Sequence, residues 1–432
     1  MLLPGDCAPH FKAASSVNPN FNFDTVAGRY VVLSFFGTTK LPAAERFLNA
    51  IATHEDRFDV TNLIFFGVTN DPDDAKILQH THNGRIFFYD LDGAVSRLYQ
   101  VLTERPADGD ASRTVKSLTP TIFVLDQALR VLATFPLVDE TDRCITAIFD
   151  FVESLPRLPA RSTAAPVLIV PYVFEPELCR ALIDYYEQKG GEDSGFMRDV
   201  DGKTIGVTDH THKRRMDCEI TDERLIRATQ ERVRRRIVPA IRQAFQFTAT
   251  RIERHIVACY DAEQGAHFRA HRDNTTLGTA HRRFAITINL NSPEYDGGEI
   301  WFPEFSATRY KPPSGAAIVF SCSLLHEVPK VTRGKRYAFL PFLYDGAAAA
   351  IRERNRKHLG SLAAAGGAAP THVCASAATV GESGTPIPVL DGNCGCGNPS
   401  GCGTCLSAAT YPLEPAPARN TTAATDSSLK PA

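Results

Sequence analysis

The chain has 432 residues, enough for two or three domains of about 100 to 200 residues each. Its hydrophobic fraction of 43% and charged fraction of 22% are ordinary for a soluble protein, and its formal net charge of −2 gives no global reason to expect a nucleic-acid or anionic-membrane partner. No run of about 18 apolar residues could span a membrane, and the first residues lack the basic and apolar regions of a signal peptide, so we expect a cytoplasmic protein.

Residues 1–155 alternate strand-like and helix-like segments. Runs of β-branched and aromatic residues predict strands, and apolar residues at helical spacing predict helices, one of them with Asp71 as its N-cap. This alternation predicts an α/β fold in which helices cover a sheet. The predicted strands are 29–36, 63–69, 121–125 and 129–135, and the predicted helices are 42–53, 72–81 and 140–155.

Three segments of this region carry a family resemblance. Gly5-Asp-Cys-Ala-Pro-His-Phe11, Leu118-Thr-Pro120-Thr-Ile-Phe and the helix-like 90–99 are similar to the opening, the cis-proline segment and the middle helix of the peroxiredoxin or thioredoxin-like family. A peroxidase of that family needs a thiolate at the start of the helix after the first central strand, where the helix N-terminus lowers the thiol pKa. No cysteine occurs between Cys7 and Cys144, so we expect a redox-inactive thioredoxin-like domain.

Thiol-dependent peroxidase activity through Cys7 or Cys144 is the alternative for this domain, although neither cysteine is placed at that helix start. Three roles remain open for a redox-inactive domain: delivery of substrate, formation of a homodimer, or stabilisation of the chain. Six scattered cysteines show no spacing typical of a disulfide framework and are expected to be reduced and buried. They are Cys7, Cys144, Cys179, Cys218, Cys259 and Cys322.

Residues 156–165 are predicted to be a linker by composition, and a second domain, 166–345, follows. It begins with a strand and a helix, and from residue 248 onward short strands become frequent. This spacing predicts a double-stranded β-helix, a jelly-roll barrel with flanking helices and a ligand cavity between its two sheets. The predicted strands are 251–260, 283–291, 299–303, 316–321 and 336–344.

A His-x-Asp pair and a later histidine stand out in this domain. In an extended segment residues two apart project from the same face, so His271 and Asp273 can point at one ion while Arg272 points away. His326 follows a predicted strand. Two imidazoles and one carboxylate with open positions beside them are typical of non-haem Fe(II) oxygenases.

The surrounding motifs carry a second resemblance. Gly297-Gly-Glu and His326-Glu-Val328-Pro-Lys-Val331-Thr-Arg-Gly334-Lys-Arg336 resemble the pattern of the prolyl-4-hydroxylase-like branch of the 2-oxoglutarate/Fe(II)-dependent dioxygenases. The resemblance extends over roughly 165–345 and implies that His271, Asp273 and His326 hold Fe(II). It also implies that 2-oxoglutarate chelates the iron while its distal carboxylate meets Arg336, whose guanidinium offers two parallel donors. Tyr260 resembles a tyrosine that assists at the co-substrate.

The implied reaction is decarboxylation of 2-oxoglutarate to succinate and CO2, coupled to hydroxylation of a substrate, with L-ascorbate as auxiliary reductant. The substrate is unidentified: peptidyl proline, another protein or a small molecule all fit. The alternative for the whole domain is a non-catalytic, cupin-like binding module. Lys335 is the rival of Arg336, but neighbours in a strand face opposite ways, so only one of them can enter the barrel.

Four other histidines are alternative metal ligands by residue type. His267 and His281 match no motif position, and His210 and His212 sit in a polar, basic segment that predicts a loop or a pocket rim. The basic runs 213–215 and 232–236 could meet an acidic substrate, although such runs are more often solvated helix faces.

Residues 346–432 change to a composition of Ala, Gly, Thr, Ser and Pro, which predicts a largely disordered, low-complexity tail. A cysteine cluster within it could bind zinc or copper through thiolates. Its members are Cys394, Cys396, Cys402 and Cys405.

Overall fold

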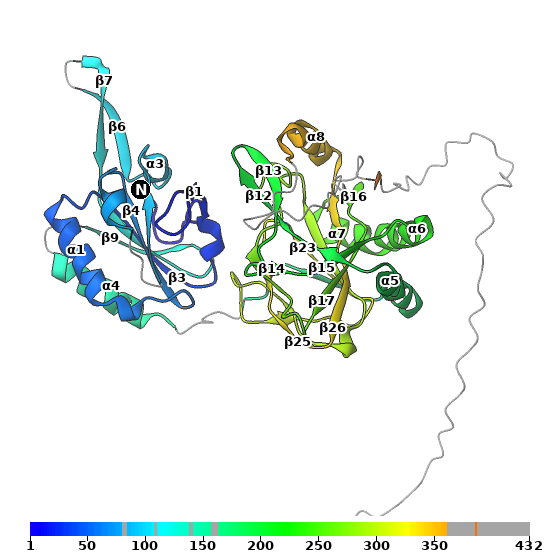
Figure 1. Cartoon of the computed structure of the whole chain (residues 1–432). Helices are drawn as coiled ribbons and strands as arrows, with labels where there is room; N and C mark the ends of the chain where they lie inside the picture. Colours follow the sequence, from blue (N-terminus) through cyan, green and yellow to red (C-terminus); the bar gives the residue numbers. More distant parts are fainter. Residues whose placement is uncertain (80–83, 108–109, 138–140, 157–162, 361–384, 387–432) are drawn as a thin grey trace, which may run out of the picture. The chain divides into compact units, whose positions relative to one another are not determined.

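The computed structural model describes residues 1–79, 84–107, 110–137, 141–156, 163–360 and 385–386. Two sheet systems follow one another along the chain, the first within residues 30–136 and the second within residues 168–344 with one further strand at 385–386 (Figure 1). The predicted cysteine cluster and most of the predicted linker lie outside the described residues.

The first region is an α/β unit built on a mixed sheet. Its order is β5 (Arg85–Tyr89), β4 (Leu63–Thr69), β3 (Tyr30–Gly37), β8 (Thr121–Leu125) and β9 (Val131–Pro136). The first three strands are parallel, and β8 and β9 are antiparallel additions. Helices α1 (Pro42–Thr53) and α4 (Thr141–Ser154) pack together on one face, and α3 (Ala94–Leu98) packs on the other (Figure 1). The α/β prediction is confirmed.

Local details of this unit differ from the expectations. Helix α2 (Asp74–Ile77) is shorter than predicted and begins after Asp73, so the expected N-cap, Asp71, was wrong. The Asp71 carboxylate accepts hydrogen bonds from the Asp73 backbone N–H at 2.9 Å and from Thr38 Oγ1 at 2.8 Å, and it pairs with Lys40 Nζ at 2.9 Å. A hairpin of β6 (Leu102–Ala107) and β7 (Asp110–Leu118) was not predicted, because its charged sequence lacks apolar alternation. Short elements are β1 (Lys12–Ala13), β2 (Phe21–Asn22) and 3-10 turns at Phe23–Val26 and Glu55–Arg57.

The second region contains two large sheets. The ten-stranded sheet has the order β11 (Glu192–Asp193), β15 (Met216–Glu219), β17 (Ile256–Asp261), β26 (Lys335–Phe339), β19 (Phe284–Asn289), β27 (Phe342–Tyr344), β16 (Arg251–Glu253) and β28 (Thr385–Pro386), with β10 (Leu168–Val170) and β23 (Ala317–Ser321) joined through β19. The five-stranded sheet has the order β14 (Lys213–Arg214), β18 (His267–His271), β24 (His326–Val328), β21 (Ile300–Trp301) and β22 (Arg309–Tyr310). Two further pairs are β12 (Phe196–Val200) with β13 (Lys203–Val207), and β20 (Asp296–Gly297) with β25 (Val331–Arg333). The jelly-roll prediction is confirmed.

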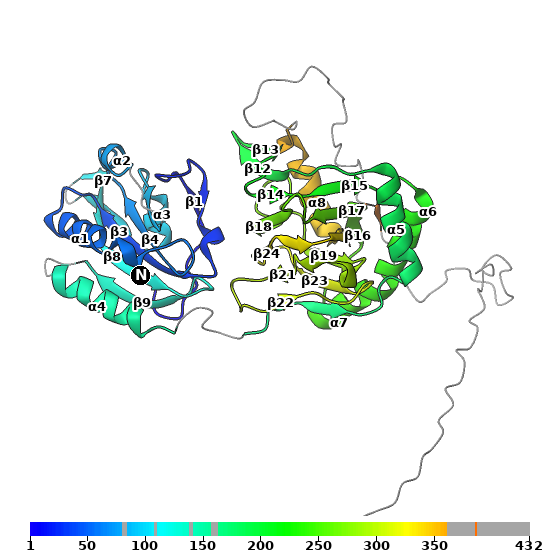
Figure 2. The ribbon, with the colours of Figure 1, turned by 60° about the horizontal axis from the view of Figure 1, so that its bottom comes forward.

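Period-two alternation separates two cores in this barrel. On β17, Val257 and Cys259 pack against helices on the outer face of the large sheet, whereas Ala258 and Tyr260 face the interior. The outer helices are α5 (Pro176–Lys189), α6 (Glu223–Arg232) and α7 (Val238–Phe245), and a π-helical turn, Val233–Ile237, joins the last two. Figure 2 shows α5 and α6 on the side of the large sheet away from β18 and β24. The helices therefore cover one face and leave the interior face to line a site.

The structure divides two predicted strands of this region and changes the start of the predicted tail. The predicted strand 336–344 divides into β26 and β27. The predicted strand 251–260 divides into β16 and β17 at Arg254, whose φ of 70° is incompatible with a continuous strand. Residues 346–355 are not the start of a disordered tail but form helix α8 (Gly346–Asn355), followed by a 3-10 turn at Arg356–His358. The Asp345 side chain begins α8 by accepting a hydrogen bond from the Ala348 backbone N–H at 2.8 Å.

Candidate metal centre

The strand pairing of the small sheet brings His271, Asp273 and His326 together. His271 ends β18 and lies directly opposite His326, which begins β24. Asp273 Oδ1 is 3.5 Å from His271 Nε2, and Asp273 Oδ2 is 3.4 Å from His326 Nε2. One ligand atom from each residue lies within 4.8 Å of the others, and this is the one such group of His, Cys, Asp or Glu in the described part of the chain. The sequence-predicted trio is therefore one cluster in space.

Hydrogen bonds orient both imidazoles with the same nitrogen free. His271 Nδ1 lies 2.8 Å from Arg269 O, and His326 Nδ1 lies 3.0 Å from Leu324 O. Because a carbonyl only accepts, each Nδ1 carries a proton, and each Nε2 is turned toward Asp273. Neutral imidazoles aimed at a carboxylate are the donor set that a divalent transition metal requires.

The charge states in the cluster suit a cation. Burial and the neighbouring His326 lower the pKa of His271 to about 4, so its imidazole is neutral near pH 7. Burial alone would raise the pKa of Asp273, but His326 and His271 hold it below its ordinary value, so the carboxylate is ionised. The residues present therefore fit a divalent metal such as Fe(II).

A buried ion pair supports both segments that carry the cluster. Arg272 Nη2 lies 2.7 Å from Glu304 Oε1 and Arg272 Nη1 lies 3.1 Å from Glu304 Oε2. Glu304 Oε2 also accepts the backbone N–H of Leu325 at 2.9 Å. Arg272 stands between His271 and Asp273 in the sequence, and Leu325 precedes His326. One carboxylate thus ties the two segments together from behind.

Arg336 and Tyr260 face each other in the interior of the barrel. They are paired across β26 and β17, and the Arg336 guanidinium lies 5.0 Å from the centre of the Tyr260 ring. Arg336 is 2% exposed, and its Nε and Nη1 have no hydrogen-bond partner among the described residues. Its Nη2 donates a hydrogen bond to Asn289 Oδ1 at 3.4 Å. The sequence did not single out Asn289 as a site residue. A buried guanidinium with free donors is a place for a carboxylate.

The other candidate histidines are used elsewhere. His267 Nδ1 lies 2.9 Å from Gly265 O, His281 Nε2 lies 2.6 Å from Glu253, and His210 Nε2 lies 2.7 Å from Asp193. His212 packs against Phe196, and burial lowers its pKa to about 4. None of the four joins the metal cluster.

The cysteine expectations were right for five of the six cysteines. All six are unpaired thiols, and all are buried except Cys7, which is exposed and for which the expectation was wrong. Burial raises the pKa of Cys144, which lies on α4. The residues before α1 are Thr38, Thr39 and Lys40. A peroxidase of this kind requires a thiolate at the start of this helix, and this chain has none there.

Comparison with known proteins gives two family matches. Residues 255–344 match the 2OG-Fe(II) oxygenase superfamily, and residues 4–134 match the AhpC/TSA family. The oxygenase match lies within the barrel and includes His271, Asp273, His326 and Arg336. The proteins of the matched superfamily are, by its description, 2OG-Fe(II) oxygenases, and the His271–Asp273–His326 cluster of this chain fits such a metal.

The curated relatives are PKHD-type hydroxylases. One from Synechococcus sp. (strain JA-2-3B'a(2-13)) is 37% identical over 89 residues, which are 19% of this chain and 39% of the relative. One from Hyphomonas neptunium is 27% identical over 158 residues, 34% of this chain and 67% of the relative. The chain thus spans about two fifths (39%) of the Synechococcus relative. Among solved structures, a Trichoplax adhaerens prolyl hydroxylase has 17% identity and a TM-score of 0.36, covering 49% of this chain and 94% of that one.

Proposed function

We propose that the protein is an Fe(II)- and 2-oxoglutarate-dependent dioxygenase that hydroxylates an acceptor substrate and releases succinate and CO2. The observation that carries the proposal is the presence, in one cavity, of the His271–Asp273–His326 cluster and the buried guanidinium of Arg336, whose Nε and Nη1 have no hydrogen-bond partner among the described residues. A cation site and an anion site in one cavity suit a co-substrate that binds a metal at one end and a positive charge at the other.

The chain's own residues have distinct roles in this proposal. His271, Asp273 and His326 hold the metal through two Nε2 atoms and a carboxylate oxygen. Arg336 binds the distal carboxylate of 2-oxoglutarate, and Tyr260 forms part of the wall beside it. Phe268 stacks on the His271 ring at 3.5 Å and Phe320 lies 4.7 Å from the His326 ring, so apolar surface shields the cluster from water. Bound Fe(II) would supply O2 activation and oxidising power at the expense of 2-oxoglutarate.

Several features of the proposal concern the whole protein. L-Ascorbate serves as auxiliary reductant, the acceptor is a protein or a small molecule, and the protein works in the cytoplasm. Among the described residues no helix is both long and apolar enough to cross a lipid bilayer. The thioredoxin-like domain acts without redox chemistry, since it lacks a thiol at the start of α1.

The test is succinate formation from 2-oxoglutarate under air with Fe(II) and ascorbate, without added acceptor. Slow turnover is expected for the wild type, and Asp273→Ala is expected to lower it at least 100-fold because the only carboxylate of the metal site is removed. Asp184→Ala, which removes an exposed carboxylate on α5, is the matched control and should keep wild-type turnover. A wild type that binds neither metal nor 2-oxoglutarate would contradict the proposal and favour a cupin-like binding module.

A further inference from the structure

The cavity that holds the metal cluster contains a second buried cation that the proposed chemistry does not use. Lys213 is 4% exposed, and its ammonium donates hydrogen bonds to Ser194 Oγ at 2.7 Å and to Gly195 O at 2.6 Å. Both acceptors are uncharged, and Lys213 forms no ion pair with a carboxylate within the described ranges. A buried ammonium without a counter-ion is unfavourable, so this position calls for an anion.

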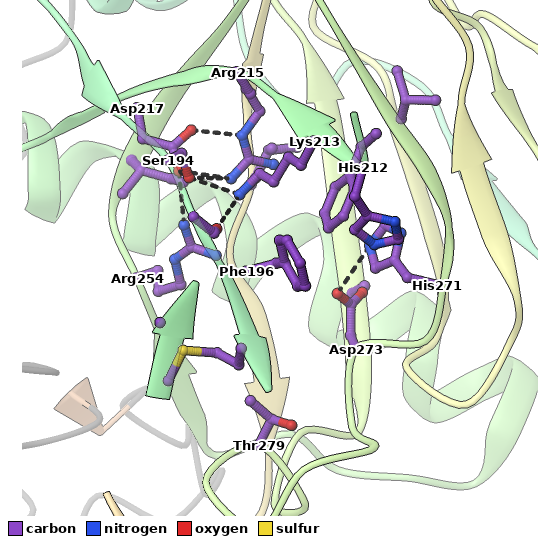
Figure 3. A pocket seen from close by; sticks show the side chains of 18 of the residues that line it. Ser194, Phe196, His212, Lys213, Arg215, Asp217, Arg254, His271, Asp273 and Thr279 are labelled. Atoms are coloured by element: carbon purple, nitrogen blue, oxygen red, sulfur yellow. Dashed lines mark hydrogen bonds and ion pairs between the residues drawn. The ribbon is translucent and has the colours of Figure 1, made fainter. Parts of the chain in front are cut away.

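The neighbouring carboxylate is already shared by other cations. Asp217 accepts hydrogen bonds from Arg215 Nε at 2.7 Å and Nη2 at 2.6 Å, and from Arg254 Nη2 at 3.0 Å (Figure 3). Two guanidinium groups therefore share this one carboxylate. Burial and the charge of Arg215 lower the pKa of Lys213 well below its ordinary value, and an anion beside it would oppose that effect.

Lys213 lies one aromatic ring away from the metal cluster. It pairs with Phe268 across β14 and β18, and its Nζ is 4.9 Å from the Phe268 ring centre. The Phe268 ring stacks on His271 with centres 3.5 Å apart. In Figure 3, Phe196 lies between the polar group around Lys213 and the side chains of His271 and Asp273. An anion at Lys213 would therefore lie in the same cavity as the metal cluster, where an acceptor has to bind.

The co-substrate does not account for this position. 2-Oxoglutarate has two carboxylates, and the proposed function, on which this inference rests, assigns one to the metal and the other to Arg336. Arg336 lies on β26 of the large sheet, whereas Lys213 lies on β14 of the small one. We infer that Lys213 binds a carboxylate of the acceptor, which makes the acceptor an acid: either a free carboxylic acid or an acidic side chain of a peptide.

Calorimetry on the full chain loaded with Mn(II) and saturating 2-oxoglutarate tests this inference. Two matched probe pairs distinguish the sources of the carboxylate: N-acetylglycine against N-acetylglycinamide, and the blocked tripeptide Ala-Glu-Ala against Ala-Gln-Ala. We expect the acid of at least one pair to bind the wild type at least tenfold more tightly than its amide. In Lys213→Met the acid should bind only as well as the amide, and Lys213→Arg should keep most of the preference.

Lys330→Met is the matched control, because Lys330 lines the same cavity but is exposed at its margin. It should change the preference for the acid less than twofold. Equal binding of acid and amide to the wild type, or binding of neither, would overturn the inference. If 2-oxoglutarate still binds in that case, the proposed function is unaffected. A fall in 2-oxoglutarate affinity in Lys213→Met as large as that in Arg336→Met would assign Lys213 to the co-substrate and also overturn it.

Discussion

Arg336 and Lys335 are neighbours on β26 with opposite environments. Arg336 is 2% exposed and faces the cavity, whereas Lys335 is exposed on the other side of the strand. Gly298 has a φ of 68°, and a Cβ there would lie 2.7 Å from Val331 and 3.5 Å from the Arg336 side chain. The Gly-Gly-Glu motif therefore has a physical reason: a side chain at Gly298 would crowd the segment that covers Arg336.

At this scale we predict that Arg336→Met raises the KM for 2-oxoglutarate about 100-fold, since losing a buried, charge-assisted contact costs about 3 kcal/mol. Succinate formation at varied 2-oxoglutarate concentration measures the effect. Lys335→Met removes the adjacent exposed charge and should change the KM less than twofold. Equal effects of the two substitutions on the KM would show that Arg336 acts only through the long-range electrostatic potential of the pocket and does not bind the carboxylate directly.

At the scale of elements, a β-bulge sets the geometry of the metal cluster. Phe268 pairs with Val328 and His271 pairs with His326, so three steps along β18 match two along β24. Residues three apart in a regular strand face opposite sides, yet the Phe268 and His271 rings stack with an interplanar angle of 18°. The extra residue places the aromatic wall and the first ligand on the same face.

We predict that Glu304→Gln weakens metal binding roughly tenfold, because the Arg272 pair it would lose holds the two ligand segments together. Titration of the metal-free protein with Mn(II) or Co(II) measures this. Glu177→Gln on the exposed face of α5 is the control and should leave metal affinity at the wild-type value. If Glu304→Gln binds metal with the affinity of the wild type, the Arg272–Glu304 ion pair contributes only to the stability of the fold and not to the metal site.

At the scale of the whole molecule, buried neutral histidines make the fold sensitive to acid. Burial lowers the pKa of His255 from 6.5 to about 4, and that of His212 falls to the same value. Between pH 6.5 and 4 the unfolded chain binds more protons than the folded chain at these positions. The stabilisation is therefore complete above about pH 6.5 and decreases as the pH falls towards 4.

We accordingly predict that the melting temperature of the metal-free protein falls steadily from pH 6.5 to pH 4. His255→Asn should reduce this slope, because an amide does not titrate in that range. Thermal unfolding followed by circular dichroism at a series of pH values measures both curves. Parallel curves for the wild type and His255→Asn would mean that other groups govern the acid sensitivity.

The sequence by itself determined the fold classes and the metal trio. Alternating hydrophobic periods predicted the α/β unit and the barrel, because the period reports which faces are buried. His271, Asp273 and His326 form one cluster and Arg336 lines the same cavity, while their roles as metal ligands and co-substrate residue stay predictions. The sequence alone also showed that no cysteine precedes α1 at the position that a peroxidase requires.

Only the tertiary structure decided which basic residues belong to the site. The basic runs 213–215 and 232–236 look alike in the sequence, yet Lys213 and Arg215 are buried in the cavity while Arg232 pairs with Glu175 on the helical side of the sheet. The sequence likewise did not predict the bulge in β18, the contacts of Glu304 with both ligand segments, or the contact of Asn289 with Arg336. Each depends on side chains far apart in the sequence, and local patterns carry no information about such non-local contacts.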